Sequence, residues 1–177
     1  MGRSKKEPIS VEELANNLAT YAIDREELKQ LIQAIPQDND LNMATLEYEL
    51  QILRILSVGW AISFYMPKTP EKKSLSLIFW ENIKEISTSI STLMETTTGQ
   101  TIDYFTILKE RLDVYVKAMQ KNQDGASEPT TIMGPAFAGA CGIPENAIAI
   151  LIGTKMFTLC LGGVKEYLES VEITPIP

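Results

Sequence analysis

Histidine is absent from the 177-residue sequence, and only two cysteines are present. The lack of histidine excludes Ser-His-Asp and Cys-His catalysis, histidine-ligated metal sites and the usual side-chain pH switch near neutrality. The motifs Gly-x-Gly-x-x-Gly, Gly-x-x-x-x-Gly-Lys, Gly-x-Ser-x-Gly and Cys-x-x-Cys are also missing. We therefore expect no metal and no cofactor, and we consider an enzyme less plausible than a binding protein. No motif is specific enough to name a family.

Basic residues are few and mostly scattered. The chain has 16 Lys and Arg against 23 Asp and Glu, which gives a formal net charge of −7. The only basic cluster is Arg3, Lys5 and Lys6, so a nucleic-acid partner is not expected. Glu7-Pro8 and an acidic amphipathic stretch follow this cluster, where a signal peptide needs an apolar segment. The sequence therefore predicts a cytoplasmic protein.

The two cysteines, Cys141 and Cys160, are nineteen residues apart and have no neighbouring metal-ligand residues. Both lie in apolar stretches, which favours buried structural thiols in a reducing compartment. A reactive or disulfide-bridged pair is the alternative interpretation.

Helical spacing of apolar residues dominates the chain, and the alternation typical of a β-domain is missing. We predict one all-α domain, a helical bundle of five to six main helices with two short helices at the N-terminus. The third helix is expected to run from residues 40–42 to Met66. The predicted organisation is a disordered N-terminus (1–8), a helical pair acting as a cap or a dimer arm (9–36), the bundle core (40–171) and a C-terminal tail (172–177).

Two apolar stripes follow the third helix and predict an antiparallel helical hairpin. The first and second stripes each repeat at alternating spacings of three and four residues, and the turn Thr96-Thr97-Thr98-Gly99 separates them. Each stripe predicts a helix of about 22 residues. The stripes consist of Phe79, Ile83, Ile86, Ile90 and Leu93, and of Phe105, Leu108, Leu112, Tyr115 and Met119.

The last third of the chain is nearly uncharged and rich in glycine. Between residues 129 and 164 only Glu145 and Lys155 are charged. We predict a short helix over 135–141 with Pro135 in its first turn, and a long final helix over 144–170 at the centre of the fold. Small residues recur every four positions at Gly134, Ala138 and Gly142, which allows a close approach of two backbones.

The stretch Ala147 to Val164 is 18 residues long, close to the lower limit for a membrane-spanning helix. Lys155 lies in its middle, where a lysine costs roughly 2.5–3.5 kcal/mol on insertion scales. We therefore predict a buried core helix and no membrane span.

Six side chains are candidates for a ligand-binding site. Glu47 and Arg54 share one face of the third helix, where they could orient a substrate or simply form ion pairs. Lys155 could act as a nucleophile or general base, or its stem could cover apolar surface while its ammonium group reaches water. A pocket between the third and final helices would be lined by Trp60, Tyr65, Cys141 and Lys155.

These observations favour a non-enzymatic protein that works as a homo-oligomer, most simply a dimer, with a further protein partner as an additional possibility. Packing signals are strong in the sequence, whereas no complete catalytic set is present. The alternatives are a small-molecule binding protein with the pocket described above or, less favoured, an enzyme that uses Glu47, Arg54 or Lys155.

Overall fold

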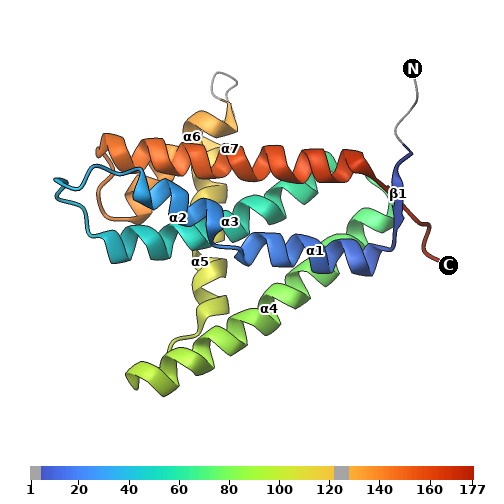
Figure 1. Cartoon of the computed structure of the whole chain (residues 1–177), viewed down its shortest axis with the longest axis horizontal. Coiled ribbons are helices and arrows are strands. Elements are labelled where there is room, and N and C mark those ends of the chain that lie inside the picture. Colours follow the sequence, from blue (N-terminus) through green and yellow to red (C-terminus); the bar gives the residue numbers. More distant parts are fainter. Residues whose placement is uncertain (1–4, 122–127) are drawn as a thin grey trace.

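The computed structural model describes residues 5–121 and 128–177. Over these ranges the chain forms seven helices and one two-stranded parallel sheet (Figure 1), which confirms the prediction of a single all-α domain with two short N-terminal helices. The elements are β1 (Glu7–Ile9), α1 (Val11–Ile23), α2 (Glu26–Gln33), α3 (Met43–Tyr65), α4 (Pro70–Thr98), α5 (Tyr104–Lys121), α6 (Pro129–Ala140), α7 (Ala147–Ser170) and β2 (Val171–Ile173).

Helix α3 is the centre of the fold, a position that we predicted for the final helix. Every residue from Ile52 to Gly59 is buried, including Arg54 and Ser57, because other helices surround this part of α3. Helix α7 packs along α3 and α6 packs against both, while α1 covers α3 and α4. One face of α7 stays exposed, including Leu151 and Lys155. Helices α1 and α2 both pack on other helices of their own chain.

Capping residues explain where three of the helices begin. Ser10 Oγ accepts a hydrogen bond from the Glu13 amide at 3.1 Å, so the predicted start of α1 is observed. Asn42 and Asn146 cap α3 and α7 in the same way.

Helix α6 begins six residues earlier than predicted. Pro129 occupies the first turn, where the missing amide proton of proline costs nothing, and Pro135 lies inside the helix. The assignment of Pro135 to the first turn was therefore wrong. Gly142 ends this segment with a φ of 77°.

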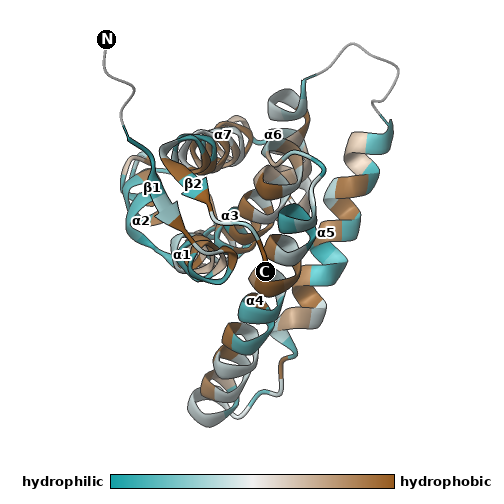
Figure 2. Cartoon of the chain, turned by 90° about the vertical axis from the view of Figure 1, so that its right-hand side faces the viewer, coloured by the Kyte–Doolittle hydropathy of each residue, from teal (hydrophilic) through white to brown (hydrophobic). Residues whose placement is uncertain are grey.

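The small sheet was not predicted. Residues 7–9, expected to be partly disordered, pair in parallel with residues 171–173, at the boundary of the expected tail. Figure 2 shows the two strands side by side, and Figure 1 shows them at one end of the molecule, where α7 leads into β2 beside β1. Residues 1–4 of the predicted disordered segment lie outside the described ranges.

The end of α4 projects from the body of the molecule. In Figure 1 the part of α4 nearest its C-terminus extends beyond the other helices, and α5 turns away from it at a steep angle. We call residues 86–98 the arm. The apolar stripe of α4 is buried at Phe79 and Ile83 but 63% exposed at Leu93, so the stripe continues past the helices that cover it.

Candidate functional site

Arg54 is fully buried and connects three helices. Its Nη1 donates to Glu27 Oε2 at 2.6 Å, and its Nε and Nη2 donate to the carbonyl oxygen of Tyr21 at 3.1 and 2.8 Å. The guanidinium carbon also lies 4.4 Å from the centre of the Tyr21 ring. Burial raises the pKa of Tyr21 to about 12, so this phenol stays neutral. All of these partners lie inside the fold, which is typical of a structural side chain.

Glu47 lies on the surface and forms an ion pair with Arg25, in which both side chains are substantially exposed. One turn further along α3, Gln51 donates from Nε2 to the Ala22 carbonyl at 3.1 Å. Its Oε1 is buried and accepts no hydrogen bond within the described part of the chain. Glu47 and Arg54 therefore have different partners and do not form one polar pocket.

A second buried ion pair was missed in the sequence. Glu49, only 3% exposed, receives two hydrogen bonds from Arg111, from Nε at 2.8 Å and from Nη2 at 2.5 Å. The pair joins α3 to α5. The only sequence feature that points to this ion pair is the acidic residue Glu49, which lies on the buried side of α3. The nearby hydroxyl of Tyr115 is buried without a hydrogen-bond partner in the described residues.

The remaining predicted site residues are dispersed. The Trp60 ring stacks on Phe64 with 4.9 Å between centroids, and Phe157 of α7 packs against it at 5.6 Å. This direct aromatic contact fills the space in which we predicted a pocket. Trp60 instead lines a cavity of about 230 Å³ together with residues of α5 and α6.

Lys155 is exposed on α7, Cys141 is half-buried after α6, and Tyr65 lies at the far end of α3. Neither cysteine forms a disulfide. The six candidate residues thus do not meet in one site.

A different hollow lies where the arm leaves the body. This hollow, which we call the arm notch, has a volume of about 580 Å³. Most of its lining is apolar, and the exposed Arg25–Glu47 pair lies at its border. The lining residues are Ile23, Arg25, Ala44, Glu47, Tyr48, Gln51, Ile55, Ile86, Ile90, Leu93, Met94 and Tyr104.

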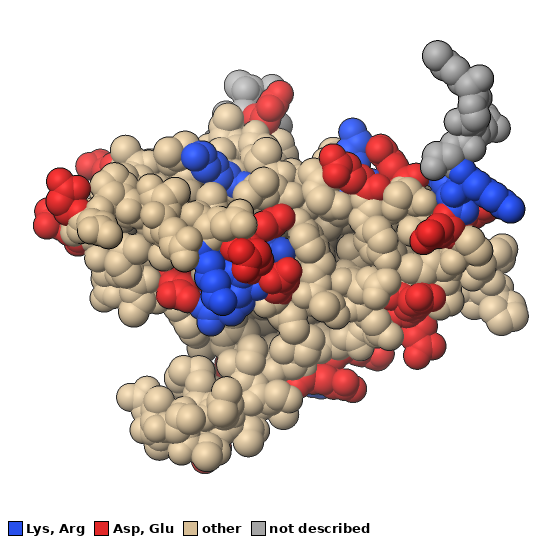
Figure 3. Space-filling model, viewed as in Figure 1, with Lys and Arg blue, Asp and Glu red and all other residues tan. Residues whose placement is uncertain are grey.

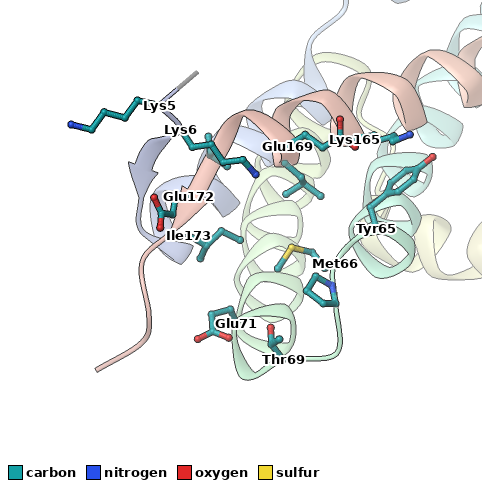
Figure 4. A pocket seen from close by; sticks show the side chains of 13 residues that line it. Lys5, Lys6, Tyr65, Met66, Thr69, Glu71, Lys165, Glu169, Glu172 and Ile173 are labelled. Carbon is teal, nitrogen blue, oxygen red and sulfur yellow. The ribbon is translucent and has the colours of Figure 1, made fainter. Parts of the chain in front are cut away.

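A larger hollow of about 1150 Å³ lies beside the sheet, and we call it the end hollow. In Figure 4, Lys6 and Lys165 lie along one side and Glu71 along the opposite side, while the side chain of Lys5 points away. Its lining residues are Lys5, Lys6, Tyr65, Met66, Pro67, Thr69, Glu71, Lys165, Leu168, Glu169, Val171, Glu172 and Ile173.

Over residues 5–121 and 128–177, no cluster of three or more Cys, Asp or Glu side chains is placed to hold a metal ion. Helix α7 is long and apolar enough to cross a membrane, and 39% of its most apolar window is buried inside the molecule, which is weak evidence for a span. No protein-family model matches the sequence, and no curated protein or solved structure is significantly similar to it.

Proposed function

We propose that this chain is a non-enzymatic interaction protein that works as a homodimer, and that two copies pair through the arm and the arm notch. The observation that carries the proposal is the uncovered end of the α4 stripe. Ile86 and Ile90 are only partly buried and Leu93 is 63% exposed, although the same stripe is buried at Phe79. An apolar stripe that continues past its intramolecular partner is typical of a helix that a second chain covers.

The charge distribution favours a second copy as the occupant. From Ile86 to Ile102 the only charged residue is Glu95, in a chain whose net charge is −7. In Figure 3 the arm, at the lower left, shows almost no charged atoms. Two copies of an acidic protein repel each other over most of their surfaces, and the arm is a surface where that repulsion is small.

The position of the notch also fits a symmetric dimer. In a two-fold interface the same surface of each copy must be complementary to itself. The arm contributes one wall of the notch, through Ile86, Ile90, Leu93 and Met94, and the body contributes the other. A rotation about a two-fold axis would therefore place each arm against the notch of the other copy.

Size-exclusion chromatography with light scattering tests the proposal. We expect a dimer at micromolar concentrations, and we expect Leu93→Glu to weaken the dimer at least about tenfold because it places a charge in an apolar contact. Leu77→Glu is the matched control. Leu77 is also on α4 and is 59% exposed, but it lies outside the notch. A wild-type protein that is strictly monomeric, or equal effects of the two variants, would contradict the proposal.

A further inference from the structure

The register of the small sheet fixes which peptide groups of β2 face β1. Ile9 pairs with Ile173, and the Thr174 amide donates to the Ile9 carbonyl at 2.9 Å. The backbone groups of successive residues along a strand point to opposite edges, so those of every second residue point to the same edge. The peptide groups of Glu172 and Thr174 therefore face β1, and the N–H and C=O of Ile173 point to the free edge of β2.

The two outer edges of this sheet differ. On β1 the residue whose backbone faces outward is Pro8, between the inward-facing Glu7 and Ile9, and proline has no N–H to offer. A proline on an exposed edge prevents a further strand from pairing there. Within β2 the open edge has no such block, because Ile173 presents both a donor and an acceptor, and the open edge ends before Pro175.

The end hollow lies along this open edge. Val171, Glu172 and Ile173 all border it, although successive side chains of a strand point to opposite faces. A hollow that touches all three must run beside the strand. Its volume of about 1150 Å³ is above the range of about 300–1,000 Å³ that is usual for small-molecule sites.

The walls of the end hollow combine an apolar floor with charges of both signs. Met66, Pro67 and Leu168 supply apolar surface. Lys6 and Lys165 lie on one side with Glu169 between them, and Glu71 lies on the other side (Figure 4). None of these four side chains, nor that of Glu172, takes part in an ion pair with another described residue.

We propose that the open edge of β2 binds an extended peptide segment of a partner protein by strand addition, with the side chains of that segment lying in the end hollow. Backbone hydrogen bonds to Ile173 supply affinity, and the hollow supplies specificity. The walls favour a segment with an apolar residue on the floor and side chains of both charges, an acidic one near Lys6 or Lys165 and a basic one near Glu71 or Glu169. A uniformly charged segment would meet like charge.

A displayed library of random octapeptides, panned against the full chain, is a direct test. We expect enrichment of peptides with alternating apolar residues and both charges, and we expect the best synthetic peptide to protect the Ile173 amide from hydrogen exchange. In the free protein this amide should exchange much faster than the Thr174 amide, which is bonded to Ile9.

Two matched substitutions separate the edge from the tail. Ile173→Pro removes the outward N–H and should weaken peptide binding at least about tenfold, whereas Ile176→Pro, three residues further on, should leave binding unchanged. Lys165→Glu, on the exposed surface, should weaken binding without any change of backbone. The proposed dimer uses the arm and not the end hollow. Measuring the oligomeric state of each variant therefore shows whether the loss of peptide binding is separate from any loss of the dimer.

Three results would overturn the proposal: no peptide enriched above background, equal binding by Ile173→Pro and wild type, or an Ile173 amide as protected in the free protein as that of Thr174.

Discussion

Arg54 illustrates how a buried charge can be structural rather than functional. Its guanidinium group satisfies the Tyr21 carbonyl at the end of α1 and the Glu27 carboxylate on α2, so one side chain on α3 fixes the N-terminal cap. We predict that Arg54→Met lowers the free energy of unfolding by about 2–4 kcal/mol, because the Tyr21 carbonyl loses its donor and Glu27, 36% exposed, loses its partner. Urea denaturation measures this change.

The control is Arg25→Met, which removes the other arginine–glutamate pair of this region. Arg25 and Glu47 are 50% and 41% exposed, and water replaces such a pair at little cost. We expect a change below about 1 kcal/mol. Equal losses for the two variants would show that burial of Arg54 does not determine its contribution.

The two thiols are predicted to be unreactive in the native protein. Burial raises the pKa of both Cys141 and Cys160 to about 12, from an ordinary value of 9.0. Since the thiolate is the reactive form, Ellman's reagent at pH 8 should react more than about 100-fold more slowly with native protein than with protein in guanidinium. Cys141→Ser isolates the reaction of Cys160. A fast reaction of the native chain would support the reactive-pair interpretation instead.

The same pKa shifts give a pH dependence of stability. The folded state keeps both thiols neutral, whereas the unfolded state ionises them above about pH 9. Their contribution to stability is therefore complete below pH 9 and is lost as the pH rises toward 12. Urea midpoints at pH 8 and pH 10 should show the decrease, and an unchanged midpoint would contradict it.

At the scale of elements, the contact between α6 and α7 depends on glycine. A Cβ atom at Gly134 would lie 2.5 Å from the carbonyl oxygen of Ile150, and backbone cannot move aside cheaply. We predict that Gly134→Ala lowers the free energy of unfolding by about 1–3 kcal/mol. Gly139→Ala, on the same helix, meets nothing within 4 Å and should be neutral or stabilising by up to about 1 kcal/mol. The thermal unfolding midpoints of both variants measure this difference. A higher midpoint for Gly134→Ala than for Gly139→Ala would contradict the prediction.

The sequence predicts elements better than it predicts their partners. The capping residue Ser10 and the regular apolar stripe beginning at Phe79 are local signals. The start of α1 follows from the first, and the presence of a helix at α4 follows from the second. The four-residue spacing that includes Gly134 also indicated a close backbone approach. Residues 7–9 pair with residues 171–173, which are far away in the sequence. A strand of three residues is too short to show an alternating apolar pattern, so the sequence does not predict this sheet.

The candidate site was less predictable for the same reason. Periodicity places Arg54 and Glu47 on one face of a helix. It does not show that Arg54 pairs with Glu27 and that Glu47 pairs with Arg25, because both partners lie outside that helix. The stripe on α4 likewise identifies Leu93 as apolar without revealing that α5 turns away and leaves it uncovered.

For the whole molecule, the net charge and the nearly uncharged arm act in opposite directions on self-association. Two copies, each with a formal charge of −7, repel each other at long range, while the arm offers apolar area with a single charged residue between Ile86 and Ile102. Added salt screens the repulsion, with a Debye length of about 30 Å at 0.01 M and about 3 Å at 1 M, but it does not weaken apolar contacts.

We therefore predict that the dimer tightens as salt increases, with the dissociation constant falling severalfold between about 0.02 and 0.5 M NaCl. Sedimentation velocity over a range of protein concentrations measures the change. Leu93→Glu should stay weakly associated at every salt concentration, because its defect is the burial of a charge rather than long-range repulsion. A wild-type dimer that dissociates as salt increases would mean that ion pairs, and not the apolar arm, hold the two copies together, since only contacts between opposite charges lose strength under screening.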